Sequence, residues 1–573
     1  MKEYYFSDRG IILNFSTKFC ITEAELLNSE SFKKVLTKYV GSLKKRGHYL
    51  YTDYLVKISR NTDLLVDLYK MLICFSYDEI LNEHFKYELL TSKREYLYNF
   101  TEGLYDYWRR LERFAVVESK SRVDGFENAS FSDATEEFSS LVLKVYRRIA
   151  ENILNEKFHV YRQLPAGINA TVLLEQVEWA KKAPYDRLKG IGFINSISLR
   201  PPFISYTKKN KRDGFFEETN LNPLENIKLT KNNYVCFPVK VGTSLAYVYL
   251  HKDYLGHAIA LSNLFQMDTR PSFDGVKPDL IYVYGAPRVE GMDNKAIKFY
   301  HDQTEDIYVG LAYYGDDIDY FGYLKKMLLT LHNVRMINQG YLPIHGACVN
   351  ISLKNGKNKT VVIIGDSGAG KSESLEALRT LLSDNINEMK TIFDDMGTFK
   401  LKDGKVFAYG TEIGAFVRLD DLENGYAMKE MDRAIFMNPD KTNSRLVMPV
   451  STYNDIIRGY NVDMVLYANN YTNTDREIKE FNTLEECLET FKSGKRFAKG
   501  TTTESGIVES YFANPFGPHQ RQAQTDRLLD TYFNVLLHQG KVIGEIYTKL
   551  GVPGMEQKGP ESVARFLSEF IKK

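Results

Sequence analysis

The chain is 573 residues long, with 43% hydrophobic residues, 26% charged residues and a formal net charge of +1. This length can supply about three to four domains or fewer large ones, and the composition is ordinary for a globular protein. The balanced charge excludes a protein that gathers nucleic acid or membrane through a general electrostatic field.

Cysteine usage and hydropathy indicate a cytoplasmic protein. The five cysteines are scattered and form no CxxC pair, so neither a disulfide framework nor a zinc site is expected. No apolar run approaches about eighteen residues, and Met1–Phe15 does not have the pattern of a signal peptide. We therefore expect a reducing, cytoplasmic environment, with neither a membrane nor nucleic acid as a partner.

Residues 1–160 are expected to form an all-helical accessory domain. Amphipathic stripes, with apolar residues three and four positions apart, are typical of packed helical bundles. No cluster of catalytic residue types occurs here, so the surface of this bundle is a candidate contact for a protein partner. Four segments carry the pattern: Ser31–Lys45, Asp63–Leu90, Lys93–Val117 and Ala134–Phe158.

Residues 161–341 are expected to form a second lobe of the α/β class. Short β-rich runs separated by Gly, Pro, Asn and Asp predict a mixed sheet. Lys208–Arg212 is a basic run in a predicted turn, which is typical of solvated surface and could also face an anionic substrate. The predicted strands are Gly192–Leu199, Tyr234–Val241, Ser244–Leu250 and Leu280–Tyr284.

Residues 342–573 are expected to form a nucleotide-binding lobe. Together with the preceding lobe, its elements predict the α/β class with mixed sheets. Its later predicted strands are Lys405–Tyr409, Ala415–Leu419, Ala434–Met437 and Met464–Ala468, and its closing predicted helices are Asp526–Leu537 and Glu561–Ile571.

The most specific motif is a phosphate loop of the pattern GxxxxGK[ST]. Thr360–Ile364 before it is a β-branched run that predicts a buried strand, and Glu373–Leu382 after it predicts a helix. The backbone amides of such a loop surround a polyphosphate, and the helix N-terminus adds positive partial charge. We therefore predict that ATP or another nucleoside triphosphate binds here. The predicted nucleotide-binding residues are Gly365, Asp366, Ser367, Gly368, Ala369, Gly370, Lys371 and Ser372.

Side chains in and around this loop are suited to metal and phosphoryl chemistry. Lys371 can reach the β- and γ-phosphates, and the Ser372 hydroxyl can hold Mg²⁺. Asp394 and Asp395 follow a short apolar run, and adjacent carboxylates after a strand can hold Mg²⁺ and ligate a second metal. The remaining candidates are Lys325, Lys326, His345 and Arg445.

Taken together and in this order, these motifs resemble those of the ATP-dependent phosphoenolpyruvate carboxykinases. That family has a Tyr-x-Gly-x-x-Lys-Lys segment, a Met-His motif, a phosphate loop, an Asp-Asp motif and a Thr-Arg-x-x-x-Pro motif. The resemblance covers roughly residues 165–540. The loop sequence GDSGAGKSES is more similar to that of HPr kinase, a relative that shares the nucleotide-binding core. The matching pieces are Tyr320–Lys326, Ile344-His345, Gly365–Ser372, Asp394-Asp395, and Arg445 with Pro449.

The resemblance implies a two-lobed, carboxykinase-like core around the phosphate loop. It also implies that the enzyme converts oxaloacetate and ATP to phosphoenolpyruvate, CO₂ and ADP. The implied Mn²⁺ ligands are Lys326, His345 and Asp395. The implied Mg²⁺ of the nucleotide lies with Ser372 and, through water, with Asp394.

The resemblance further implies roles around the two substrates. Lys371 and Arg445 would neutralise charge on the transferring phosphoryl group. Lys325 would help to hold the γ-phosphate or the developing charge. The implied substrate-binding residues are Tyr320, Gly322 and Arg200.

Two other functions remain open from the sequence. In a kinase that phosphorylates a hydroxyl of a protein or small molecule, in the manner of HPr kinase, His345 and Asp395 would serve as acid–base or metal groups. In a non-catalytic, nucleotide-responsive module, the helical N-terminal part would bind a partner. The complete Tyr-x-Gly-x-x-Lys-Lys segment favours the carboxykinase, because a hydroxyl kinase does not require it.

Overall fold

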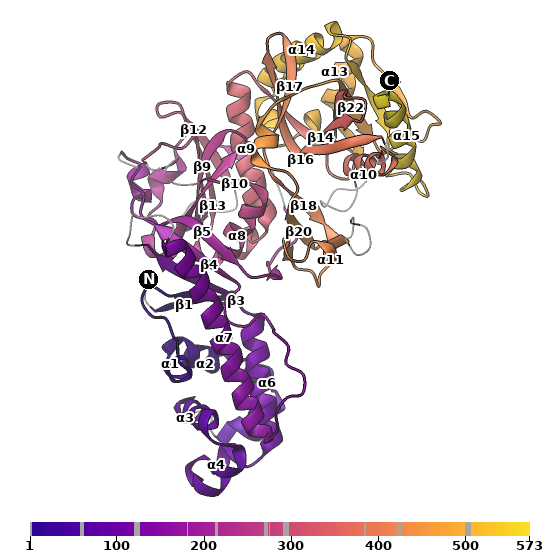
Figure 1. Cartoon of the computed structure of the whole chain (residues 1–573). Helices are drawn as coiled ribbons and strands as arrows, with labels where there is room; N and C mark the ends of the chain where they lie inside the picture. The colour runs from indigo at the N-terminus through magenta and orange to yellow at the C-terminus, as the bar shows by residue number, and fades with distance from the viewer. Residues whose placement is uncertain are drawn as a thin grey trace. The chain divides into compact units, whose positions relative to one another are not determined.

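The computed structural model describes residues 3–57, 62–119, 126–179, 182–212, 216–268, 273, 275–289, 297–382, 385–419, 422, 426–498 and 506–572. The chain divides into two compact units (Figure 1). The first comprises Met1–Gln176 and Gly192–Phe203, and the second comprises Val177–Ile191 and Ile204–Lys573. The α/β class with mixed sheets, expected from the sequence, is confirmed.

The first unit combines a helical bundle with a mixed sheet. Its strands follow the order β1-β2-β3-β4-β5, with β2, β3 and β4 parallel and the outer pairs antiparallel. The strands are β1 (Tyr4–Phe6), β2 (Gly10–Asn14), β3 (Glu112–Glu118), β4 (Ala170–Glu175) and β5 (Phe193–Leu199). The helices are α1 (Glu23–Asn28), α2 (Glu30–Lys45), α3 (Thr62–Cys74), α4 (Tyr77–Glu83), α5 (Glu88–Thr91), α6 (Arg94–Arg110) and α7 (Phe126–Leu154).

The expectation of an all-helical domain over residues 1–160 is wrong, because β1, β2 and β3 lie within it. The segment Lys93–Val117, expected to be helical throughout, changes from α6 to β3 near its end. β3 is buried from Glu112 to Val116. Its apolar part, Phe114–Val117, is too short for periodicity to separate a strand from the end of a buried helix. The unit also extends past residue 160, since β4 and β5 continue the sheet that contains β3.

The bundle itself follows the helical periodicity of the sequence. On α2 the buried residues are Val35, Leu36, Tyr39, Val40 and Leu43, the spacing of one helix face. They join one apolar core with side chains from α1, α3, α6 and α7.

The second unit contains two large β-sheets. In the first, the strands that belong to this unit follow the order β8-β9-β11-β13-β12-β7, with β10 beside β8. These strands are β7 (Glu217–Glu218), β8 (Tyr234–Val241), β9 (Ser244–His251), β10 (Gln266–Met267), β11 (Leu280–Ala286), β12 (Lys298–Asp302) and β13 (Ile307–Tyr313). The helices of this part are α8 (Leu255–Leu264) and α9 (Phe321–Asn338).

The other large sheet has the order β21-β17-β16-β14-β15-β22-β26-β23. Its strands are β14 (Leu342–Leu353), β15 (Asn358–Ile364), β16 (Ile386–Lys402), β17 (Lys405–Gly410), β21 (Tyr460–Asn461), β22 (Met464–Asn469), β23 (Ile478–Glu480) and β26 (Val542–Tyr547). The helices that follow are α10 (Lys371–Leu382), α11 (Tyr426–Lys429), α12 (Tyr453–Ile457), α13 (Leu484–Ser493), α14 (Gln522–His538) and α15 (Lys558–Lys572).

Both faces of this sheet are covered by helices. Val361 and Ile363 of β15 pack in a core with α10 and α15, whereas Val362 and Ile364 pack in a core with α13 and α14. Figure 1 shows α10 beside α15, the last helix of the chain. Since successive strand residues point to opposite faces, the continuous apolar run Thr360–Ile364 reads as a strand buried on both sides.

Two smaller sheets complete the second unit. Strands β18 (Gly414–Arg418) and β19 (Ile435–Met437) flank β20 (Arg445–Pro449), and β24 (Lys495–Phe497) pairs with β25 (Ile507–Glu509). The boundary expected at residues 341–342 does not divide the chain into compact units, because α9 contacts both β11 of one large sheet and β14 of the other. Within the described ranges, no helix is long and apolar enough to cross a membrane.

Candidate active site

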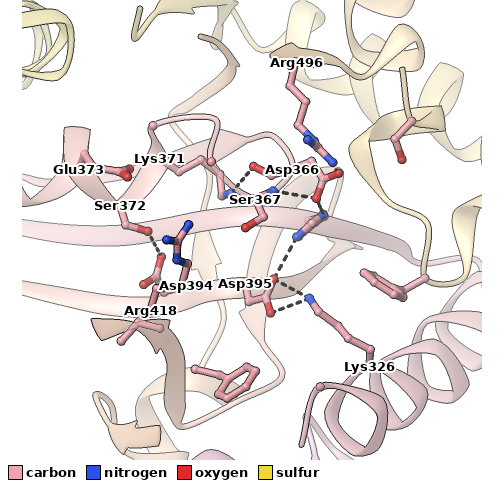
Figure 2. Close-up of a pocket in the computed structure, with 18 of the residues that line it drawn as sticks. Lys326, Asp366, Ser367, Lys371, Ser372, Glu373, Asp394, Asp395, Arg418 and Arg496 are labelled. Carbon is pink, nitrogen blue, oxygen red and sulfur yellow. Dashed lines mark hydrogen bonds and ion pairs between the residues drawn. The ribbon is translucent and has the colours of Figure 1, made fainter. Parts of the chain in front are cut away.

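The second unit contains a cavity of about 790 Å³ that is lined by most of the residues expected from the sequence to form a site. Its walls come from the phosphate loop, the start of α9, and strands β14, β16, β18 and β20 (Figure 2). A cavity of this size is suited to a small-molecule ligand.

The phosphate loop connects β15 to α10, as the sequence predicts. Two buried side chains from later strands fix its backbone. Thr548 donates its hydroxyl to the carbonyl of Ala369 at 2.6 Å, and Asn470 donates its side-chain amide to the carbonyl of Gly368 at 2.9 Å. Both side chains follow parallel strands, β26 and β22, so the loop lies at the carboxyl edge of the sheet, where ligands of open α/β sheets bind.

Gly370 is expected to be intolerant of alanine. Its φ is +89°, and an added Cβ would lie 2.7 Å from the Thr548 side chain. Strain and displacement of the loop should weaken ATP binding by at least about tenfold, since a left-handed L-residue alone costs about 1–2 kcal/mol.

The matched control for that variant is Gly356→Ala. Gly356 has a φ of +83°, but an added Cβ would meet nothing within 4 Å. Titration of both variants with ATP, followed by calorimetry, should show weakened binding in Gly370→Ala and unchanged binding in Gly356→Ala, whose strain lies outside the phosphate loop. Equal ATP affinity in Gly370→Ala and the parent protein would contradict the prediction.

Asp366 anchors the loop through both carboxylate oxygens. One accepts the backbone N–H of Ser367 at 2.7 Å, and the other accepts the Arg496 Nε–H at 2.8 Å (Figure 2). Burial disfavours its charge, but His345 and Arg496 outweigh burial and lower the pKa of Asp366. Lys371 Nζ donates to the Asp366 carbonyl at 2.9 Å. The loop is thus held in shape by its own charged residues.

Ser372 and Asp394 form a pair of oxygen ligands beside the loop. The Ser372 hydroxyl donates to Asp394 Oδ1 at 2.8 Å. Burial raises the pKa of Asp394 to about 6, although Ser372 and Lys371 oppose the shift. A hydroxyl and a carboxylate at this separation are the ligand types that Mg²⁺ prefers.

Lys326 and His345 both contact the carboxylate of Asp395. Lys326 Nζ lies 2.9 and 2.7 Å from the two Asp395 oxygens, and His345 Nε2 lies 3.0 Å from Asp395 Oδ1. His345 Nδ1 lies 2.6 Å from the carbonyl oxygen of Ala513, which can only accept a hydrogen bond. Nδ1 therefore carries a proton, and a neutral ring would place the Nε2 lone pair against a carboxylate oxygen. Such a contact calls for a proton or a metal cation between the two atoms.

Lys325 is buried behind this group rather than open to the cavity. It is only 1% exposed, and its Nζ lies 2.5 Å from Asp395 Oδ2 and 2.9 Å from Glu412 Oε1. Burial opposes its charge, but Asp395 and Glu412 outweigh burial and raise the pKa of Lys325. In this arrangement Lys325 faces two carboxylates, whereas the resemblance implied a contact with phosphate.

The surroundings of this cluster shift the pKa values of Lys325 and Lys326 in opposite directions. Burial favours a neutral Asp395, but Lys325 and Lys326 hold its pKa well below the usual range. Burial and the neighbouring Lys325 lower the pKa of Lys326 against the attraction of Asp395. Burial raises the pKa of Glu412, with Lys325 opposing the shift. Lys326 is therefore the lysine more easily made neutral, the form that can ligate a metal.

Three other expected residues also line the cavity: Tyr320, Gly322 and Arg445. The Arg445 guanidinium lies 5.2 Å from the centre of the Phe416 ring, and its Nη2 donates to Asn443 at 3.1 Å. Within the described part of the chain, Arg445 Nε is buried without a hydrogen-bond partner. It therefore has unused donors for an anionic ligand.

Arg200 is not among the residues that line this cavity. It belongs to the first unit, pairs with Glu136 at 2.9 Å and lines a different cavity. Arg212 of the second unit lines the candidate site instead, with its guanidinium 5.1 Å from the centre of the Phe516 ring. Arg212 ends the basic run Lys208–Arg212, which the sequence indicated to be surface or substrate-facing.

Sequence reasoning missed other contributors: Arg418, Glu412, Arg496, Asn470 and Thr548. Each is a single polar residue that belongs to no recognisable sequence motif. Each contacts the site only because the folded chain brings distant segments together. No spacing rule would have selected them.

Comparison of the sequence with protein-family models and with curated proteins gives no match. Within the described ranges, no three His, Cys, Asp or Glu side chains form a metal-binding group by themselves. A metal at the cluster described above would require Lys326 as its third ligand.

Proposed function

We propose that this chain is a phosphoenolpyruvate carboxykinase-like enzyme that converts oxaloacetate and ATP to phosphoenolpyruvate, CO₂ and ADP. The observation that carries the proposal is one cavity that combines a phosphate loop with the convergent group Lys326, His345 and Asp395. Phosphoryl transfer needs the loop, whereas loss of CO₂ needs positive charge next to the enolate that develops.

Two divalent cations fit the residues present. Mn²⁺ would be held by Lys326, His345 and Asp395, and Mg²⁺ by Ser372 and, through water, Asp394. The orientation of the His345 ring supports the Mn²⁺ assignment. Its Nδ1 binds the Ala513 carbonyl, which leaves Nε2, next to Asp395, as the nitrogen that can ligate a metal. A bound divalent cation would supply Lewis-acid stabilisation of negative charge.

The surrounding cations would act on the substrates. Lys371 and Arg445 would neutralise charge on the transferring phosphoryl group and hold it in line. Tyr320 and Gly322 would shape the pocket for the carboxylate substrate. Arg212 takes the place first assigned to Arg200, because Arg212 lines the cavity and its guanidinium can form a bidentate pair with a carboxylate.

The experiment that tests this proposal measures phosphoenolpyruvate formed from oxaloacetate with ATP, Mg²⁺ and Mn²⁺, with GTP and pyrophosphate as parallel donors. Phosphoenolpyruvate itself must be measured, because oxaloacetate also loses CO₂ spontaneously. Product with one donor supports the reaction and identifies that donor. No product with any donor, together with clear ATP binding, would overturn the carboxykinase assignment.

The second candidate is a kinase that phosphorylates a hydroxyl group. Asp394 favours it, because this carboxyl lines the cavity and lies 2.8 Å from the Ser372 hydroxyl of the phosphate loop, where a hydroxyl acceptor would meet the phosphate. Burial also raises its pKa to about 6, which suits a proton acceptor near neutral pH. ATP hydrolysis or phosphoryl transfer to a hydroxyl acceptor without phosphoenolpyruvate formation would favour this function.

A further inference from the structure

The first unit contains a second cavity, of about 440 Å³, on one side of α7. Four cationic side chains line it, three from α7 and one from the residue that follows β5. The described residues that line this cavity all belong to the first unit. The four cationic residues are Lys144, Arg147, Arg148 and Arg200.

The helix register explains why the cations gather there. Lys144 and Arg148 are one turn apart, and Arg147 lies between them, so all three project from neighbouring rows of α7. Among the described residues of the lining, Glu151 is the one acidic residue. It already accepts the Phe158 backbone N–H at 3.2 Å and the Tyr161 hydroxyl at 2.5 Å. The lining therefore carries an excess of positive charge.

Most of the guanidinium donors around this cavity remain available. Arg147 donates to the carbonyl of Arg162, and Arg200 donates to Glu136 at 2.9 Å. Lys144 pairs with Glu23 at 2.6 Å. Within the described ranges, Arg148 has no side-chain hydrogen bond or ion pair. Because each guanidinium carries five N–H donors, these contacts leave several donors for a ligand.

We propose that this cavity binds a small phosphate-bearing anion. Clustered guanidinium groups match the oxygen geometry of phosphate in a bidentate manner. Ser140 in the lining adds a hydroxyl group, whereas the Ser139 hydroxyl already donates to the Thr135 carbonyl at 2.8 Å. A cavity of about 440 Å³ accommodates a metabolite-sized ligand rather than a folded partner. The first unit thus has an anion site of its own, in a part of the chain that lacks the phosphate loop.

The test uses the full chain with Lys371→Ala, which disables the phosphate loop, and inorganic pyrophosphate as the probe. Calorimetry should detect pyrophosphate binding to this protein. Adding Arg147→Gln and Arg148→Gln should weaken that binding by at least about tenfold, because each change removes charge-assisted hydrogen bonds to the anion. Arg110→Gln is the matched control, because Arg110 is 74% exposed on α6, and it should leave the affinity unchanged.

Arg200→Gln provides an independent variant from a different segment and should also weaken binding. Unchanged affinity in both the Arg147/Arg148 and the Arg200 variants, or no pyrophosphate binding in the Lys371→Ala protein, would overturn the proposal. The readout is binding with the loop disabled, so the result does not depend on the proposed reaction.

Discussion

Replacement of Lys326 by alanine is expected to lower the rate of phosphoenolpyruvate formation by about a hundred- to a thousandfold, the range found when one preorganised charge-stabilising group is lost. ATP affinity should stay within about threefold of that of the parent protein. Lys326 contacts Asp395 through two short distances, 2.9 and 2.7 Å, but none of its hydrogen bonds involves the phosphate loop. The change therefore removes a metal ligand and leaves the loop intact.

Lys326→Arg separates the two roles that the lysine could have. Arginine keeps the positive charge next to Asp395, but its guanidinium is not available as a neutral nitrogen ligand. If the role is to ligate Mn²⁺, the arginine variant should be as inactive as the alanine variant and should need far more Mn²⁺. Recovery of turnover in Lys326→Arg would show that charge alone is required.

The matched control for both variants is Lys277→Ala. Lys277 lies in the same unit and is 52% exposed; its Nζ donates to the Glu305 backbone carbonyl and lies 4.0 Å from the Glu305 carboxylate. It should leave both turnover and ATP affinity unchanged. Full turnover in Lys326→Ala, measured as phosphoenolpyruvate formation at saturating ATP, would rule out the carboxykinase assignment.

The phosphate loop could be predicted from the sequence because its determinants are local. A β-branched run, a glycine-rich turn and a helix stand next to one another, and each reads correctly by itself. The Asp394-Asp395 pair was selected by its local sequence, two adjacent carboxylates after a short apolar run, but it lies inside β16 and not after a strand. Local patterns therefore account for the loop and for the identity of most candidate residues.

Which side chains of the site contact one another could not be predicted from local sequence. His345 and Asp395 become neighbours through the antiparallel register of β14 and β16, where Gly346 lies opposite Asp395. Lys325 and Lys326 are consecutive on α9, and only packing decides that one is buried while the other faces the cavity. Register and packing are long-range properties that no single segment specifies.

The arginine assigned to the substrate shows the same limit. Arg200 and Arg212 are twelve positions apart in the sequence, Arg200 before two prolines and Arg212 before Asp-Gly, so both stand next to turn-forming residues. The structure places Arg200 in the cavity of the first unit and Arg212 in the candidate active site. The resemblance assigned Arg200 to the substrate from its sequence neighbours. The path of the chain between the two arginines, which the sequence does not show, brings Arg212 to the cavity instead.

Glu412→Ala is expected to destabilise the second unit by about 3–5 kcal/mol, the cost of removing one partner from a buried ion pair. Glu412 is 3% exposed and Lys325 1% exposed, and they lie 2.9 Å apart. Without Glu412, the buried Lys325 charge keeps only Asp395, which it shares with Lys326. Glu412→Gln should cost less, because the amide oxygen can still accept a hydrogen bond from Lys325.

Tryptophan fluorescence can measure this loss of stability for the second unit by itself. The chain has two tryptophans, and Trp179 belongs to the second unit, where its indole N–H donates to Tyr249 at 2.8 Å. In a Trp108→Phe background, urea unfolding monitored through Trp179 therefore reports the free energy of unfolding of that unit.

Glu561→Gln is the matched control for the loss of a carboxylate. Its side chain is 57% exposed and lies 3.8 Å from Arg565, so the change should cost less than about 1 kcal/mol. A similarly small cost for Glu412→Ala would mean that Lys325 is neutral or solvated in the folded protein. In that case Lys325 would be free to reach the phosphate, the role that its position next to Lys326 first indicated.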